Sequence, residues 1–149
     1  MLTKRESGGD EYYTPSWIFD GLALSFDLDP CSPVEGGCVP ALHTFTIKDD
    51  GLSKAWFGLV WLNPPYSKPS PWVDKFIAHN NGLALLPFTR GKWWFNLWNH
   101  SDAIMPIGYD FKFQHQDGTK KVITFNTALY AIGQQAVDAL AKLKLHRVR

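Results

Sequence analysis

The chain has 149 residues, of which 45% are hydrophobic and 19% charged, a composition typical of one globular domain and not of a disordered segment. The formal net charge of +1 excludes a polycation that binds nucleic acid through overall charge. The charge is uneven, because residues 1–75 hold six Lys and Arg against ten Asp and Glu, whereas residues 76–149 hold nine against four. The excess of basic residues in the second half of the chain is compatible with a solvated basic surface or with a half that faces phosphate.

Periodic apolar residues and turn residues predict strands that alternate with helices. Thr14 and Pro15 are typical of a helix N-cap and first helical residue, and Ser70 and Pro71 repeat the pattern. The predicted helices cover residues 15–24, 71–79, 92–99 and 134–145. The predicted strands cover residues 26–29, 59–62, 83–88, 103–107, 109–113, 122–125 and 128–132. Residues 31–48 are expected to be mostly loop.

This order of elements predicts the fold class. Strands alternating with helices favour an α/β fold of three layers with a mostly parallel sheet. The strands over 109–113 and 122–125 are expected to form an antiparallel C-terminal hairpin around Asp117-Gly118. We expect a single domain over residues 1–149, without a separate target-recognition domain.

Cysteine content and hydropathy bear on the compartment. Cys31 and Cys38 are too few for the disulfide framework of a small secreted domain. Together with His43 they match no common zinc spacing, so we expect no metal. The first ten residues contain no apolar signal core, and no apolar run is long enough to cross a membrane. We therefore expect a cytoplasmic protein with reduced thiols and no membrane partner.

The most informative motif is Asn63-Pro64-Pro65-Tyr66, directly after the apolar run 58–62. Two prolines end a strand and stiffen the turn, so Asn63 is expected at a strand's carboxyl end, where open α/β sheets bind ligands. The Asn63 side chain and the Pro64 carbonyl offer acceptors, and Tyr66 offers a flat ring. This set suits a planar group that carries an NH2, such as adenine. Taken alone, the tetrapeptide is also compatible with an ordinary proline turn.

The tetrapeptide resembles motif IV, (Asn/Asp)-Pro-Pro-(Tyr/Phe), of amino-group methyltransferases that use S-adenosylmethionine. Further segments resemble the phage-type (Dam-like) DNA N6-adenine methyltransferases of bacteriophages and prophages. These are Glu-Tyr-Tyr-Thr-Pro at 11–15, Phe-Asp-Leu-Asp-Pro-Cys-Ser at 26–32, and Thr-Ile-Lys-Asp-Asp-Gly-Leu at 46–52, followed by Trp56. Later blocks at 85–90, 93–94, 109–113 and 125–133 extend the similarity to about residues 10–133.

The resemblance implies a Rossmann-like methyltransferase that transfers a methyl group from S-adenosylmethionine to the exocyclic amine of a flipped adenine. The implied catalytic residues are Asn63, Pro64, Pro65 and Tyr66. The implied cofactor-binding residues are Tyr12, Tyr13, Thr14, Pro15, Asp29, Pro30, Cys31, and Asp49 or Asp50. Helix capping by Thr14 and ordinary turn roles for the aspartates remain open alternatives. One feature departs from the family pattern, because the glycines Gly36-Gly37 come late in the loop after the first strand.

The implied macromolecular partner is duplex DNA. A base inside a duplex must be flipped out before it reaches such a site, and Tyr66 would then stack on it. Phe111 or Phe113 would cover the second face, with core packing as the alternative. Lys112, Lys120, Lys121, Arg90 and Lys92 are candidate phosphate contacts, with plain solvation as the alternative.

Three other questions stay open at this level. Target recognition is either short or supplied by a second subunit of a homodimer. A methyltransferase that acts on an RNA base or a protein glutamine, and a catalytically inactive DNA-binding relative, are the alternative functions. Protection from restriction and regulation of phage DNA are both compatible biological purposes.

Overall fold

The computed structural model describes residues 14–107, 113–114, 120–121 and 126–146. The strands are β1 (Phe26–Asp29), β2 (Ala41–Thr44), β3 (Val60–Leu62), β4 (Gly82–Pro87), β5 (Ala103–Ile107), β6 (Phe113–Gln114), β7 (Lys120–Lys121) and β8 (Thr127–Ile132). The helices are α1 (Ser16–Leu22), α2 (Ser70–His79), α3 (Lys92–His100) and α4 (Gln134–His146), with a short 3-10 helix η1 (Gly51–Ser53).

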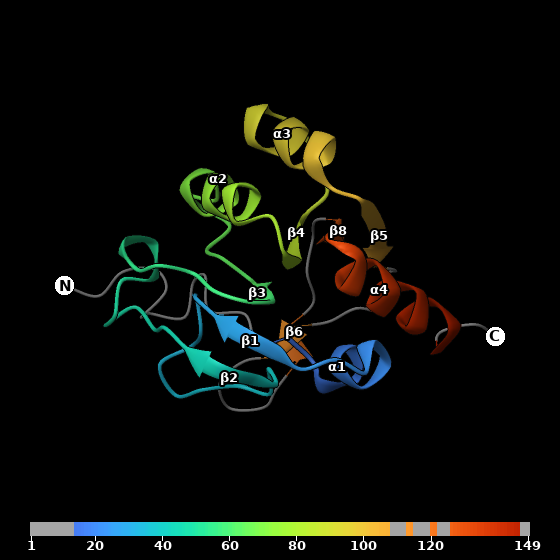
Figure 1. The fold of residues 1–149 in the computed structure, drawn as a ribbon, viewed down its shortest axis with the longest axis horizontal. Helices are drawn as coiled ribbons and strands as arrows, with labels where there is room; N and C mark the ends of the chain where they lie inside the picture. Colours follow the sequence, from blue (N-terminus) through green and yellow to red (C-terminus); the bar gives the residue numbers. More distant parts are fainter. Residues whose placement is uncertain (1–13, 108–112, 115–119, 122–125, 147–149) are drawn as a thin grey trace.

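Six of the strands form one mixed sheet in the order β2-β1-β3-β4-β8-β5 (Figure 1). Strands β2, β1, β3 and β4 run parallel, with Leu28 beside Val60 and Trp61 beside Leu83. Strand β8 is antiparallel to both β4 and β5. The predicted α/β class, with a parallel sheet and an antiparallel edge, is confirmed, and β8 and β5 form that edge.

The predicted hairpin differs from the observed pairing. An antiparallel pair is present, but it joins Phe113 to Lys121 and Gln114 to Lys120, in a two-stranded sheet of its own. The turn predicted at 117–118 and the arms predicted over 109–112 and 122–125 lie outside the described residues. As far as the described residues extend, this strand pair is separate from the six-stranded sheet.

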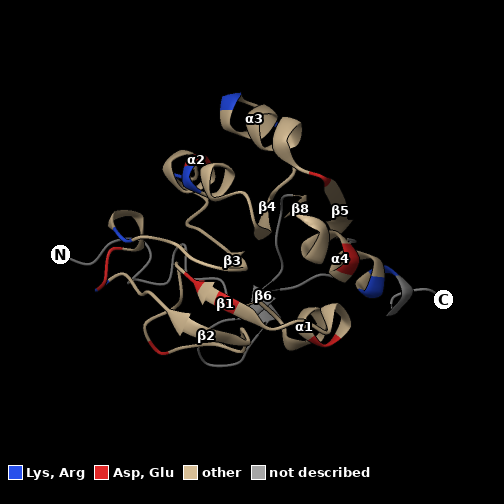
Figure 2. Cartoon of the chain, viewed as in Figure 1, with Lys and Arg blue, Asp and Glu red and all other residues tan. Residues whose placement is uncertain are grey.

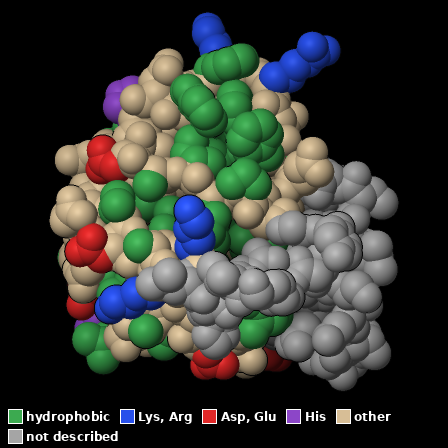
Figure 3. Space-filling model, turned by 90° about the vertical axis from the view of Figure 1, so that its right-hand side faces the viewer, with side chains coloured by type: hydrophobic (Ala, Val, Ile, Leu, Met, Phe, Trp, Pro, Cys, Tyr) green, Lys and Arg blue, Asp and Glu red, His purple; other side chains and the backbone are tan. Residues whose placement is uncertain are grey.

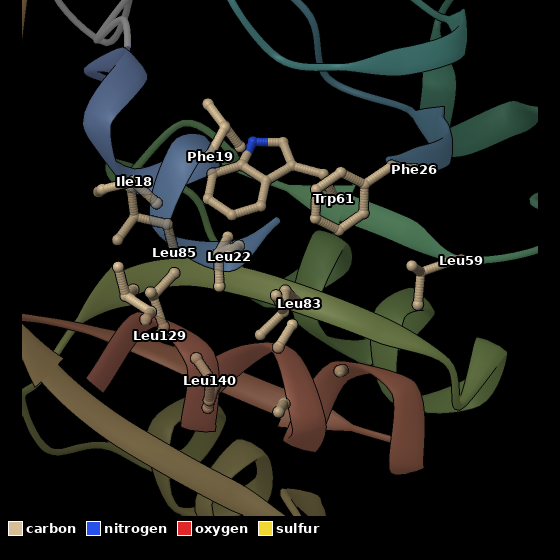
Figure 4. Packing of buried hydrophobic residues seen from close by; sticks show 14 of the residues in the cluster. Ile18, Phe19, Leu22, Phe26, Leu59, Trp61, Leu83, Leu85, Leu129 and Leu140 are labelled. Atoms are coloured by element: carbon tan, nitrogen blue, oxygen red, sulfur yellow. The ribbon is translucent and has the colours of Figure 1, made fainter. Parts of the chain in front are cut away.

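Helices cover the two faces of the sheet and make three layers (Figure 1). Side chains alternate between the faces of a strand, so Leu83 and Leu85 of β4 face one side, and Ala84 and Leu86 face the other. Helices α1 and α4 bury their apolar residues in the first cluster, and α2 and α3 in the second. Figure 4 shows part of the first cluster, in which the Phe19 and Trp61 rings meet edge to face at 4.8 Å.

Strand β2 lies in the segment expected to be loop, so that expectation is wrong at residues 41–44. The reason is exposure, because β2 is an edge strand and Leu42 keeps 78% of its surface accessible. A strand with few buried side chains has no alternating apolar pattern to reveal it. The pairing with β1 therefore comes from backbone hydrogen bonds that periodicity does not report.

The start of α1 also corrects an expectation. Thr14 is not the N-cap, because Pro15 occupies the cap position. The helix start has no side-chain capping hydrogen bond. The helix ends at Leu22, two residues earlier than predicted, where Ala23 takes a left-handed conformation with φ 51°. In α2, Ser70 is the first helical residue and not the cap, and Asn80 ends the helix with φ 65°.

A buried hydrogen-bond chain fixes α3 to the sheet. The indole N–H of Trp94 donates to the Tyr130 hydroxyl at 2.7 Å, and that hydroxyl donates to the Pro87 carbonyl at 3.0 Å. Both side chains are buried, and burial raises the pKa of Tyr130 to about 12. The end of β4 and the start of α3 are therefore held in register with β8. No helix in the described part of the chain has the length and apolar character needed to cross a membrane.

Tyr130→Phe is expected to lower the free energy of unfolding by about 1–3 kcal/mol, because the buried Trp94 N–H loses its acceptor. Chemical denaturation at neutral pH measures this loss. The raised pKa adds a signature. Unfolded tyrosine ionises near pH 10, below the folded value of about 12, so wild-type stability falls as pH rises from about 10 to about 12. The variant lacks this component, and an equally stable variant would contradict the account.

Candidate active site at the carboxyl edge of the sheet

The candidate site lies where the parallel strands end. Carboxyl ends of parallel strands meet at one edge of a sheet, which is where open α/β sheets bind ligands. Strand β1 ends at Asp29, and β3 is followed directly by Asn63. Strand β2 leads into the segment 45–50, and β4 leads into the loop before α3. Four of the predicted site segments therefore reach the same edge.

The Asn63 amide is held at both ends. Its Nδ2 donates to the Thr14 hydroxyl at 3.4 Å, and its Oδ1 accepts from the Tyr66 hydroxyl at 2.8 Å. The Tyr66 hydroxyl also lies 3.1 Å from the Leu85 carbonyl oxygen of β4, so one proton is shared between two acceptors. Thr14 is buried, and the segment before α1, the turn after β3 and strand β4 jointly orient the Asn63 amide.

The remaining motif residues support this geometry. Pro64 is buried, and Pro65 and Tyr66 are half-buried. The Tyr66 side chain contacts both apolar clusters, since it lies at the sheet edge where the two faces meet. Cys38 further anchors Thr14, because its thiol donates to the Thr14 carbonyl at 2.9 Å. Burial raises the pKa of this thiol, which keeps it protonated as a donor.

Asp29 lies buried at the end of β1 with only 2% of its surface accessible. Its Oδ1 accepts from the Cys31 backbone N–H at 3.1 Å, and its carbonyl accepts from the Phe45 N–H at 2.9 Å. The Phe45 carbonyl in turn accepts from the Ser32 N–H at 2.9 Å. The turn after β1 is thus joined to the segment after β2. Pro30 is buried in this turn, and the Cys31 side chain belongs to the second apolar cluster.

The loop between β1 and β2, which contains Gly36, differs from a glycine-rich cofactor loop. Gly36 adopts φ 77°, and its N–H donates to the Pro33 carbonyl at 2.9 Å. A Cβ at Gly36 would meet no atom within 4 Å. The late glycine therefore serves a local turn between Pro33 and Gly36.

Asp49 and Asp50 occupy different environments. The Asp49 carboxylate accepts from the Thr46 N–H at 2.9 Å and from the Thr46 hydroxyl at 3.3 Å, which closes the turn. Asp50 is exposed and has a left-handed backbone with φ 56°. Within the described part of the chain, the Asp50 carboxylate forms no hydrogen bond or ion pair. The sequence leaves the choice between the two aspartates open, and these contacts distinguish them.

Gly51, Trp56 and Lys75 hold the loop that carries Asp50 against the candidate site. The sequence predicted no such role for these three residues. A Cβ at Gly51 would collide with the Pro30 carbonyl oxygen, so the loop backbone lies directly on the turn after β1. The Trp56 indole donates to the Gly51 carbonyl at 2.9 Å and stacks on Trp72 of α2 at 6.3 Å. Lys75 donates to the Leu52 carbonyl at 2.9 Å. Trp72 also packs against the second apolar cluster, so no local sequence signal reveals its stacking on Trp56.

Several predicted site residues are not placed with the others. Tyr12, Tyr13, Phe111 and Lys112 lie outside the described residues. Phe113 belongs to β6, and Lys120 and Lys121 form β7, for which the backbone alone is described. Cys31 and Cys38 are both free thiols. Among the described residues, no group of three or more His, Cys, Asp or Glu side chains is arranged to hold a metal ion.

Trp56→Phe is expected to loosen the loop at 46–53, because phenylalanine keeps a ring but cannot donate to the Gly51 carbonyl. Loss of one such hydrogen bond costs about 0.5–1.5 kcal/mol. Amide hydrogen exchange of Ser53 and Lys54, whose N–H groups close η1, is expected to accelerate accordingly. Trp93→Phe on α3 is the matched control. Equal exchange in both variants would show that the Trp56 bond does not hold the loop.

Comparison with known proteins finds a matching family model and similar phage proteins. The family model described as DNA N-6-adenine-methyltransferase (Dam) matches residues 2–130. The chain is 32% identical over 110 residues to a DNA N-6-adenine-methyltransferase of Haemophilus phage HP1 (strain HP1c1), covering 65% of this chain and 62% of that protein. It is 36% identical over 96 residues to a DNA N-6-adenine-methyltransferase of Escherichia phage T1, covering 58% of this chain and 39% of that protein.

The matches thus span less than two thirds of the length of either phage protein. No solved structure matches the chain. The family model nevertheless extends over most of the sequence and includes the segment before α1, the Asn-Pro-Pro-Tyr turn and strand β8 up to Tyr130. The chain therefore belongs to the DNA N-6-adenine-methyltransferase (Dam) family, as its motifs predict.

Proposed function

We propose that this chain transfers a methyl group from S-adenosylmethionine to the N6 amine of an adenine flipped out of duplex DNA. The observation that supports this most directly is the Asn63 amide, oriented by Thr14 and Tyr66 at the carboxyl end of β3. Family membership and the phage relatives support DNA as the substrate. The four parallel strands support a Rossmann-like methyltransferase sheet as the framework.

The acceptors at the sheet edge fit the donor groups of S-adenosylmethionine. That molecule carries an ammonium group, two ribose hydroxyls and an adenine amine, all of which donate hydrogen bonds. We assign the buried Asp29 to the ammonium or the ribose, and the exposed Asp50 to the adenine amine. The other cofactor contacts that the family resemblance implies are Tyr12, Tyr13, Thr14, Pro15, Pro30 and Cys31. Asp49 then serves the turn that carries Asp50.

Asn63 and Pro64 act on the target amine. The lone pair of an exocyclic adenine amine is delocalised into the ring, which makes the nitrogen a poor nucleophile. Accepting one N–H at Asn63 Oδ1 and the other at the Pro64 carbonyl favours a tetrahedral nitrogen with its lone pair directed outward. This polarisation is strongest in the transition state, where it accelerates the step. When bound, S-adenosylmethionine would supply its sulfonium methyl group and leave as S-adenosylhomocysteine, and the methylated amine would lose one proton to solvent.

The proposed DNA contacts follow from the same site. The Tyr66 ring would stack on the flipped base, and Pro65 would keep that ring in place through the stiff turn. Phe111 or Phe113 is proposed for the opposite face of the base. Lys112, Lys120 and Lys121 are proposed phosphate contacts, and a second subunit of a homodimer remains a proposed source of target recognition.

Asn63→Ala is expected to reduce methyl transfer to DNA at least about 100-fold, because the amine loses an acceptor that acts in the transition state. Affinity for S-adenosylmethionine should stay within about twofold, since Asn63 is assigned to the acceptor base. Single-turnover transfer and calorimetric cofactor binding measure the two effects separately.

Tyr66→Phe is the matched variant for the same experiment. It keeps a ring for stacking but removes the hydroxyl that orients Asn63, so we expect a smaller loss, about tenfold, in transfer. Full activity of Asn63→Ala would refute the assigned mechanism. Full activity of Tyr66→Phe alone would show that the hydrogen bond to Asn63 does not matter for orientation.

Asp50→Asn is expected to weaken S-adenosylmethionine binding about tenfold, because an amide is a weaker acceptor than a carboxylate. Asp49→Asn is the control, since its amide oxygen can still accept from Thr46 and should leave cofactor affinity near that of the wild type. Isothermal titration compares the two. The reverse order of effects would assign the adenine contact to Asp49.

A further inference from the structure

A groove of about 850 Å³ lies between α2 and α3, outside the Asn-Pro-Pro-Tyr turn. Ser70 and Asp74 of α2 line one wall, and Phe95, Asn96 and Asn99 of α3 line the other. Arg90 and Lys92 lie at the end of the groove where α3 begins. Arg90 and Lys92 are the two lining residues that the sequence suggests as candidate phosphate contacts.

The groove lies near the carboxyl ends of the parallel strands, as the candidate active site does. Helix α2 begins at Ser70, four residues after Tyr66, and α3 begins after the loop that leaves the carboxyl end of β4. Strands β3 and β4 are neighbours, and the Tyr66 hydroxyl contacts the β4 carbonyl of Leu85. A strand of nucleic acid whose base reaches Asn63 would therefore leave the site toward the N-terminal ends of α2 and α3.

Among the described residues, no ion pair neutralises the charges in the groove. Arg90 and Lys92 are exposed, and among the described residues neither forms an ion pair. Asp74 is the one carboxylate of the lining, and it pairs with neither cation. Figure 2 shows the basic residue at the start of α3, far from the basic residues of α4. Exposed cations that have no ion-pair partner among the described residues, beside the candidate active site, suit the phosphates of a nucleic acid strand.

The uncharged lining suits bases. Asn96 and Asn99 are exposed amides that can donate and accept, as base edges require. Phe95 is 54% accessible and continues into an aromatic patch with Trp98 at 47% and Phe88 at 37%. Both rings contact Trp94, whose ring centroid lies 5.0 Å from that of Phe95 and 5.5 Å from that of Trp98. Figure 3 shows hydrophobic side chains gathered at the α3 end of one face, below basic side chains.

We propose that the α2–α3 groove holds the DNA strand next to the target adenine, with Arg90 and Lys92 on its phosphates and Asn96 and Asn99 at base edges. The exposed Phe95 ring provides a stacking surface for a neighbouring base. This inference rests on the proposed DNA substrate and assigns the contacts that flank it. A second copy of the chain is a poorer occupant, because interface cores are depleted in charged residues such as those at the groove's end.

The first test neutralises the two cations in Arg90→Gln/Lys92→Gln. Its matched control is Lys142→Gln/Lys144→Gln, which removes two exposed charges from α4 on the opposite face of the sheet. Affinity for a fluorescent unmethylated duplex is measured at several salt concentrations. Losing two phosphate contacts should lower the slope of log affinity against log salt by about two, while the control keeps a slope near the wild-type value. A wild-type slope in the groove variant, or an equal loss in both, overturns the proposal.

The second test addresses base contacts with Asn96→Ala/Asn99→Ala. Duplexes with randomised bases around an adenine are methylated, and the products are sequenced. We expect a relaxed base preference at one or more flanking positions and an unchanged affinity for S-adenosylmethionine. An unchanged base preference would refute base reading by the groove. If Phe95→Ser alters sedimentation of the protein without altering DNA affinity, the groove is a protein interface and the proposal falls.

Wild-type activity separates this inference from the function on which it rests. Methylated DNA together with unaffected groove variants refutes the groove alone. A wild-type chain that binds S-adenosylmethionine but transfers no methyl group to DNA refutes both.

Discussion

The hydrogen bonds that fix the Asn63 amide are the constraint on which the site depends. Thr14 precedes α1, Asn63 follows β3, and the Tyr66 hydroxyl reaches from the same turn to Leu85 in β4. Three separate segments must therefore be in place before the amide has one orientation. The following prolines stiffen the turn, so little reorganisation of Asn63 would remain for the proposed reaction. A dipole fixed in advance at the reacting atom is worth more than a mobile one, because its ordering cost is met during folding.

Parallel pairing explains why the other groups converge on this amide. Strands β2, β1, β3 and β4 point the same way, so the segments that follow them lie at one edge. Close approach of Gly51 to Pro30, and the Trp56 bond to Gly51, then hold the Asp50 loop against the turn after β1. Helices α2 and α3 begin at this edge as well, which places their groove beside the Asn-Pro-Pro-Tyr turn at 63–66. The cofactor side and the DNA side of the proposed site therefore share one framework.

Sequence reasoning succeeded where the signal is local. Strands at Phe26–Asp29 and Ala103–Ile107 have the predicted bounds, because turn residues or polar residues limit short apolar runs. Strand β2 was not foreseeable from periodicity, since its side chains are largely exposed. The partner of Thr14 lies 49 residues away at Asn63, and no local pattern reports such a contact. Asp49 and Asp50 are equivalent in spacing, and their difference arises from a left-handed backbone at Asp50 and a turn closed by Asp49.

The most direct test of the account identifies the methylated product. The chain is incubated with methyl-labelled S-adenosylmethionine and unmethylated duplex DNA, and the digested nucleosides are resolved by mass. The account predicts label in N6-methyladenine and in no other nucleoside. Cofactor binding without label in DNA would contradict it and indicate another methyl acceptor, such as an RNA base or a protein amide. Absence of both label and cofactor binding would indicate a DNA-binding relative that lacks the reaction.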